Sequence, residues 1–167
     1  EPVVKTNDTK IYMHYMPWYT SGPHDGSWST HWTMNNRNPE IISNGKRQIA
    51  SHFYPLIGPY SSQDPDLVEY HLLLMKYIGV DAVLIDWYGT YDVYDYRDNL
   101  RGSNALIDLA DDVGLQFGIV YEDRTTAAVV DFGQAPTKVA AATTDFQYIF
   151  DQYFSHNNYL TVAGIPV

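Results

Sequence analysis

The 167 residues carry a formal net charge of −10, with 45% apolar and 18% charged side chains and no cysteine. This composition is typical of a globular chain, and we treat residues 1–167 as a single domain with a real core. It excludes disulfides and thiolate metal sites, and no apolar run approaches the roughly 20 residues that span a bilayer. The acidic balance argues against nucleic-acid binding and favours neutral ligands.

The first predicted element is a strand over residues 10–16, which runs into a loop crowded with Trp, Tyr and His. Polar residues separate these rings, so the segment is not typical of a core element. The connection over about residues 18–63 is long for a loop that joins a strand to a helix. Rigid rings on a polar loop at a strand end suit the apolar faces of sugars.

A helix is predicted from Asp64 and Pro65 to Tyr77 or Ile78, because Asp can cap a helix and Pro fits its first position. Residues 80–87 (VDAVLIDW) then predict a buried strand, since the run is short, rich in β-branched residues and almost continuously apolar.

A second helix is predicted over residues 99–113, closed by Gly114, and a third strand over residues 115–121. A third helix is expected over about residues 144–156. Residues 159–162 follow, and the sequence stops where we expect a fourth strand to begin.

Successive strand–helix units imply a parallel sheet, either an open doubly wound sheet or the first part of a (β/α)8 barrel. No Gly-rich phosphate loop follows the first strand, and the unusual residues gather after strand ends, where barrels build their active sites. We therefore expect an α/β chain with about three β/α units and the start of a fourth strand. A whole barrel needs about 250 residues, so we expect an incomplete one.

Two strand-end carboxylates are candidate functional groups. Alternation places Asp86 on the same side of its strand as Leu84 and Tyr88, and Glu122 follows the neighbouring strand. Two adjacent carboxylates raise each other's pKa and can serve acid/base roles or bind sugar hydroxyls. The alternatives are a structural Asp bonded to loop amides and an ion pair of Glu122 or Asp123 with Arg124.

Trp18, Trp32 and Trp87 suit either stacking platforms for sugars or packing of the long loop. For His31 and His52 we expect a hydrogen bond to a sugar hydroxyl or to a neighbouring loop. The histidines lack the tight spacing of metal ligands, and no Gly-x-Ser-x-Gly elbow occurs. We therefore expect no metal and no cofactor.

Several short motifs occur in a specific order along most of the chain. They are HYMPWY at 14–19, GSW at 26–28, HW at 31–32, YPLIGPYSS at 54–62, VLIDWYG at 83–89 and YED at 121–123. In this order they resemble glycoside hydrolase family 99. Met16, where relatives often carry an aromatic residue, and the tail at 163–167 depart from the pattern.

The resemblance implies a (β/α)8 barrel and an endo-acting α-mannosidase or α-mannanase that retains configuration without a metal. One family carboxylate assists attack by the mannose 2-hydroxyl and another acts as acid/base. Both lie in a Trp/Glu-rich motif after a later strand, which residues 1–167 lack. We therefore expect the catalytic pair beyond Val167, the 167 residues alone to be inactive, and the rest of the barrel as their partner.

The resemblance also matches Tyr15 or Tyr19, Trp87 and Glu122 to positions that hold the sugar on the donor side. With the candidates above, the predicted substrate-binding set is Tyr15, Trp18, Tyr19, His31, Trp32, His52, Tyr54, Asp86, Trp87, Tyr88, Glu122 and Asp123. The expected ligand is an α-mannose-containing oligosaccharide or polysaccharide, degraded by a secreted, periplasmic or cell-surface protein. Two alternatives stay open, a non-catalytic carbohydrate-binding module and a barrel glycosidase acting on α-glucans.

Overall fold

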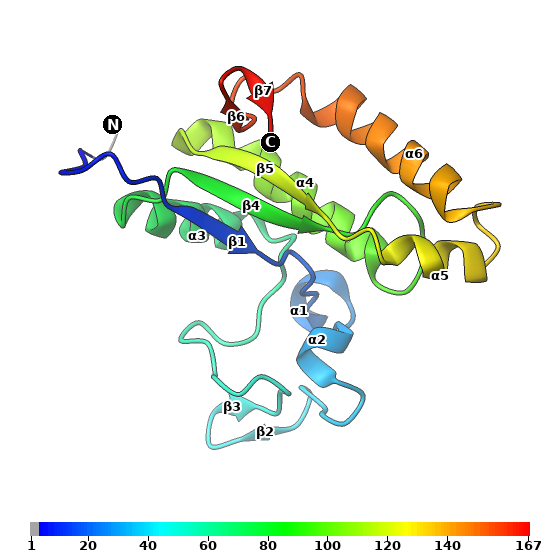
Figure 1. Ribbon diagram of the computed structural model, residues 1–167. Helices are drawn as coiled ribbons and strands as arrows, with labels where there is room; N and C mark the ends of the chain where they lie inside the picture. The colour runs from blue at the N-terminus through cyan, green and yellow to red at the C-terminus, as the bar shows by residue number, and fades with distance from the viewer. Residues whose placement is uncertain (1–3) are drawn as a thin grey trace.

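The computed structural model describes residues 4–167 and is built on a parallel sheet of three strands (Figure 1). The strands are β1 (Tyr12–Tyr15), β4 (Ala82–Trp87) and β5 (Gln116–Tyr121), in the order β1-β4-β5. All three were predicted, with β1 and β4 each shorter than expected. Their carboxyl ends lie at one edge of the sheet, where parallel α/β folds place functional groups.

Two long helices cover one face of this sheet, α3 (Pro65–Tyr77) and α4 (Tyr96–Val113). Asp64 caps α3 as predicted, since its side chain accepts a hydrogen bond from the Asp66 amide at 3.0 Å. Gly114 closes α4 in the left-handed conformation, also as predicted. Helix α4 begins before the predicted Asn99, because the polar residues ahead of it continue the helix.

The third helical region differs from the single helix predicted over 144–156. It consists of α5 (Thr125–Asp131), α6 (Lys138–Tyr148) and a π-helical turn, η1 (Ile149–Tyr153). Helix α6 begins early because the Thr137 side chain accepts a hydrogen bond from the Ala140 amide at 3.1 Å. Helix α5 was not predicted, since its Thr and Val residues have modest helix propensity.

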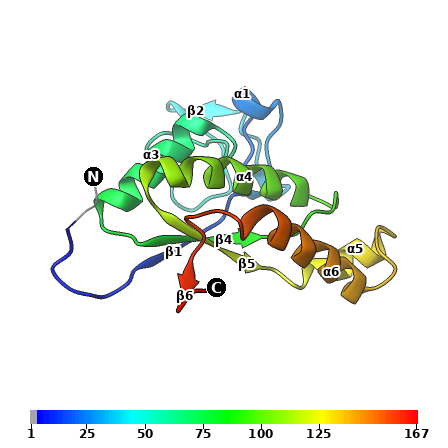
Figure 2. The same cartoon turned by 90° about the horizontal axis from the view of Figure 1, so that it is seen from above.

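The helices share one core with a single face of the sheet. Alternation places Val83, Ile85 and Trp87 of β4 on this face, where they are buried against α3, α4 and η1. Figure 2 shows α3 and α4 side by side over the strands. Leu84 and Gly118 pair across the opposite face, which we call the helix-free face because no described helix packs on it. This one-sided arrangement fits a barrel and not a doubly wound sheet.

The connection between β1 and α3 carries short elements of its own. They are helices α1 (Gly22–Asp25) and α2 (Thr30–Thr33) and an antiparallel hairpin of β2 (Ile42–Ser43) and β3 (Lys46–Arg47). Figure 1 shows this hairpin well below the sheet.

The end of the chain returns to the sheet at one residue. Tyr159 pairs in parallel with Phe117, in the place of a fourth strand. The chain then forms the hairpin β6 (Thr161–Val162) and β7 (Ile165–Pro166), so the expected start of a fourth strand is limited to Tyr159. Among the described helices, none is both long and apolar enough to cross a membrane.

Candidate functional site

Asp86 lies at the centre of a polar cluster at the carboxyl ends of the strands. Its side chain occupies the helix-free face and is only 4% exposed. On the neighbouring strand β1, the His14 Nε2 lies 3.7 Å from the Asp86 Oδ1. On the other side, the Glu122 amide donates to the Trp87 carbonyl at 2.9 Å, which continues the ladder and directs Glu122 to the same face as Asp86.

Burial raises the pKa of the Asp86 carboxyl, and the charge of Glu122 raises it further. His14 and His31 act in the opposite direction and favour the ionised form. Burial together with the carboxylates of Asp86, Asp95 and Glu122 also raises the pKa of Tyr88 well above its usual range. The Tyr88 hydroxyl is therefore a neutral donor at physiological pH, beside two carboxyl groups that can accept hydrogen bonds.

Aromatic rings of the first connection lie against this polar centre. The rings of Trp18 and His31 stack in parallel with centroids 4.1 Å apart, and the Trp18 ring lies 6.2 Å from that of Tyr88. The His31 Nε2 lies 2.7 Å from the Asp95 Oδ2, so the loop after β4 holds the loop after β1. The strand-end cluster, as we use the term, comprises His14, Trp18, His31, Asp86, Tyr88, Asp95 and Glu122.

Asn99 in the first turn of α4 fixes the backbone of the cluster. It is fully buried, donates from Nδ2 to the Asp86 carbonyl at 2.8 Å, and accepts at Oδ1 from the Tyr88 amide at 3.0 Å. One side chain of α4 thus fixes the backbone at both Asp86 and Tyr88.

Two predicted site residues lie on the opposite face of the sheet. The Tyr15 hydroxyl pairs with His71 Nδ1 of α3 at 3.0 Å, and the Trp87 ring is fully buried with that of Tyr148 6.0 Å away. Both follow from alternation, because Tyr15 is adjacent to His14 and Trp87 to Asp86. The structure therefore does not bring Tyr15 or Trp87 into the strand-end cluster.

Two more predicted residues pack inside the first connection. Trp32 is 1% exposed, donates from Nε1 to the Tyr60 carbonyl at 2.8 Å, and stacks on Tyr19 at 4.1 Å. This packing is the alternative that the sequence left open for Trp32. The Tyr19 ring also borders the strand-end cluster, since its centroid lies 6.1 Å from that of His31 and 6.3 Å from that of Trp18.

His52 and Tyr54 follow the β2–β3 hairpin, which Figure 1 shows apart from the strand ends. The Tyr54 hydroxyl accepts a hydrogen bond from the Arg47 amide at 3.0 Å, and the Lys46 ammonium lies 5.1 Å from its ring centroid. His52 is exposed and contacts Phe53. The structure does not bring these two residues to Asp86.

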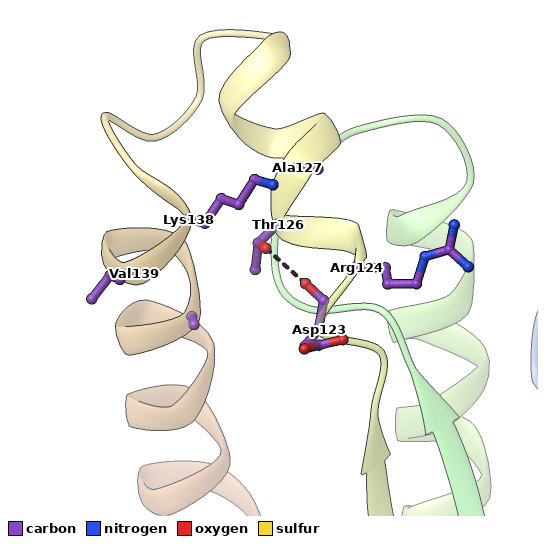
Figure 3. Close-up of a pocket in the computed structure, with 7 residues that line it drawn as sticks. Asp123, Arg124, Thr126, Ala127, Lys138 and Val139 are labelled. Carbon is purple, nitrogen blue, oxygen red and sulfur yellow. Dashed lines mark hydrogen bonds between the residues drawn. The ribbon is translucent and has the colours of Figure 1, made fainter.

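Asp123 lines a separate pocket of about 540 Å³ between α5 and α6. Figure 3 shows it with Lys138 and Thr126, while Arg124 points away; the Thr126 hydroxyl donates to the Asp123 carbonyl at 2.7 Å. Of the predicted set, the strand-end cluster thus contains Trp18, His31, Asp86, Tyr88 and Glu122, and Tyr19 borders it. Sequence reasoning missed His14, Asp95 and Asn99, of which His14 could be found by applying alternation across neighbouring strands. Among residues 4–167, no three His, Asp or Glu side chains are placed to hold a metal ion.

A parallel β/α segment with paired carboxyl groups and aromatic rings at its strand ends has the layout of a barrel glycoside hydrolase. The comparison with known families agrees, since the profile described as glycosyl hydrolase family 99 matches residues 6–164. The chain belongs to this family.

Two curated relatives carry endo-alpha-1,2-mannosidase names. The chain is 27% identical over 165 residues to the mouse "Glycoprotein endo-alpha-1,2-mannosidase-like protein", covering 87% of this chain and 32% of the relative. It is 31% identical over 88 residues to the rat "Glycoprotein endo-alpha-1,2-mannosidase", covering 47% of this chain and 19% of the relative.

A family 99 endo-α-mannosidase structure from Bacteroides thetaiotaomicron matches with a TM-score of 0.65 and 25% identity, covering 96% of this chain and 41% of that one. The sequence thus spans about a third of the mouse relative and less than half of the bacterial enzyme. The fold is that of the N-terminal part of a (β/α)8 barrel, as the sequence predicted.

Proposed function

We propose that this chain is the substrate-binding part of an endo-acting hydrolase that cleaves α-mannosides with retention. The observation that carries the proposal is the pairing of Asp86 and Glu122 beside Tyr88 and Trp18 on the helix-free face. Family membership and relatives with endo-α-mannosidase names support the substrate class.

The cluster offers the groups that a neutral sugar requires. Its carboxyl groups accept hydrogen bonds from vicinal hydroxyls, and the neutral Tyr88 hydroxyl donates one. Burial and the charge of Glu122 raise the pKa of the Asp86 carboxyl, while His14 and His31 oppose this shift. The Trp18 ring supplies apolar surface for the face of the sugar.

The bond-breaking groups are proposed to lie outside these residues. We expect the catalytic glutamate pair beyond Val167, on later strands of the barrel, which would face the strand-end cluster across the ligand. On this proposal the longer polypeptide needs no cofactor or metal, and residues 1–167 alone do not hydrolyse. A glycan substrate also favours a secreted, periplasmic or cell-surface location and a role in polysaccharide degradation.

The test uses the longest natural polypeptide that contains this sequence, assayed for hydrolysis of α-mannan and α-manno-oligosaccharides. Glu122→Gln removes a charged acceptor, worth about 1.5–3 kcal/mol, so kcat/KM falls roughly 10- to 100-fold. Asp123→Asn is the matched control, because the adjacent carboxyl lines the pocket between α5 and α6 instead.

Three outcomes would contradict the proposal. If the polypeptide cleaves no α-mannoside, the proposed activity is wrong. If it prefers α-glucans, the proposed substrate is wrong. Equal effects of Glu122→Gln and Asp123→Asn remove the role of the strand-end cluster. Binding of α-mannan by the polypeptide without hydrolysis would favour the carbohydrate-binding alternative.

A further inference from the structure

Asp145 in α6 is a buried carboxylate that contacts the loop after β4 and the end of β5. It is 1% exposed. Its Oδ1 accepts from the Thr90 amide at 2.8 Å and from the Thr90 hydroxyl at 2.9 Å, and its Oδ2 accepts from the Tyr121 hydroxyl at 2.7 Å. No salt bridge to Asp145 occurs among the described residues.

A glycine leaves the space that the Asp145 carboxyl group occupies. Gly89 adopts φ +104°, and a Cβ there would lie 2.6 Å from the Asp145 Oδ2 and 2.9 Å from its Cγ. Any other residue would force the loop away from α6, since a side chain at this φ is strained and the space is filled. The backbone at Gly89 therefore lies directly against the Asp145 carboxyl group.

The three hydrogen bonds of Asp145 go to residues that are adjacent in sequence to the strand-end cluster. Gly89 and Thr90 directly follow Tyr88 of the cluster, and Tyr121 directly precedes Glu122. One carboxylate from a helix distant in sequence thus bridges the loop after β4 and the end of β5.

A buried carboxylate without a cation is an inefficient way to stabilise a fold. Removing its charge from water is unfavourable, and burial accordingly raises the pKa of Asp145 although three hydrogen bonds favour the ionised form. Apolar packing at the same place would serve stability as well. The directional bonds to two loops are what a carboxylate adds.

We propose that Asp145 is a positioning residue, whose bonds to Thr90 and Tyr121 set the placement of Tyr88 and Asp86 relative to Glu122. This inference rests on the proposed function for its effect on hydrolysis, but the coupling of the two loops is a property of the fold.

The first test measures that coupling by hydrogen–deuterium exchange in the same natural polypeptide. Tyr121→Phe removes one hydroxyl at the end of β5, and we expect faster exchange in the other loop, over residues 88–95. Tyr77→Phe is the matched control, because Tyr77 lies at the exposed end of α3. Unchanged exchange over 88–95 in Tyr121→Phe would overturn the proposal.

The second test is a double-mutant cycle on α-mannoside hydrolysis with Thr90→Val and Tyr121→Phe. We expect each variant to lower kcat/KM by about tenfold through a higher KM, less than the roughly 100-fold that a 1 Å misplacement can bring. Because both act through Asp145, the double variant should lose little more than either single variant. The proposal would be overturned if the fold losses in kcat/KM of the two single variants multiply in the double variant. It would also be overturned if kcat alone falls and KM is unchanged, as expected when part of the enzyme is unfolded.

The two proposals fail in different ways. If the unsubstituted polypeptide cleaves no α-mannoside, the proposed function has failed, and the exchange experiment alone decides whether Asp145 couples the loops. If hydrolysis is present but Thr90→Val and Tyr121→Phe match Tyr77→Phe, only the role of Asp145 has failed.

Discussion

Replacing Asn99 by Ala tests how the strand-end cluster is held. The change removes the donor to the Asp86 carbonyl at 2.8 Å and the acceptor for the Tyr88 amide at 3.0 Å, in a side chain that is 0% exposed. Each buried backbone group left without its partner destabilises by about 1–3 kcal/mol, so the expected loss is about 2–6 kcal/mol. Thermal unfolding of the polypeptide followed by tryptophan fluorescence measures this loss.

Asn104→Ala on the same helix is the matched control. The Asn104 Oδ1 accepts one hydrogen bond, from the Tyr153 hydroxyl at 2.7 Å, and no backbone group depends on it. The change leaves one buried group, the Tyr153 hydroxyl, without this partner, so the expected loss is about 1–3 kcal/mol and this variant should melt above Asn99→Ala. Equal melting temperatures for the two variants would refute the idea that Asn99 holds the backbone at Asp86 and Tyr88.

Three further predictions concern pH and backbone conformation. Hydrogen bonds from Lys5 and the Ile11 amide lower the pKa of Asp81 to about 2, so its stabilising effect is complete above its unfolded pKa of 3.8 and is lost as the pH falls to about 2. Acid unfolding of Asp81→Asn should lack this loss, and an unchanged acid profile would contradict the assignment. Burial lowers the pKa of His71, so the folded state favours its neutral form. The resulting contribution to the free energy of unfolding is complete above the unfolded pKa of 6.5 and declines as the pH falls below that value. His71→Gln should flatten the melting temperature between pH 7 and 5, and a slope equal to that of the parent would show that other groups dominate. Gly89→Ala should lower the melting temperature by several degrees, because φ +104° and the Asp145 carboxyl oppose a Cβ; a variant that melts like the parent would show that the loop moves freely from α6.

The main elements of the fold could be predicted because local signals mark them. Asp64 with Pro65 opens α3, Gly114 closes α4, and the apolar run before Trp87 predicts β4. The region after Glu122 carries one such signal, the N-cap Thr137 of α6, which the prediction over 144–156 missed. Thr125–Asp131 and Lys138–Tyr148 form helices only in the context of the packed chain, where Ala141 and Val129 become buried.

Contacts between distant residues of the strand-end cluster were beyond single-sequence reasoning. Nothing local to Trp18 indicates that its ring stacks on His31, or that Asp95 comes from another loop to meet that histidine. The same holds for Asp145, which reads in sequence as an ordinary polar residue of an amphipathic helix. Its role depends on Thr90 and Tyr121 being brought to it by the sheet.

The placement of Tyr15, Trp87 and Asp123 outside the strand-end cluster is a different case, because the rule that explains it was available from the sequence. Successive side chains of a strand point to opposite faces. Asp86 and Trp87 therefore cannot both extend from β4 toward one ligand, nor can Glu122 and Asp123 from the end of β5. Once Asp86 is assigned to the helix-free face, the parallel register pairs its neighbour Ile85 with Tyr15, which places Tyr15 among the helices and the adjacent His14 beside the carboxyl group. Aromatic rings that are close in sequence thus lie in two different places. One set packs the helices onto the sheet, and the other set, on the loops, borders the carboxyl groups.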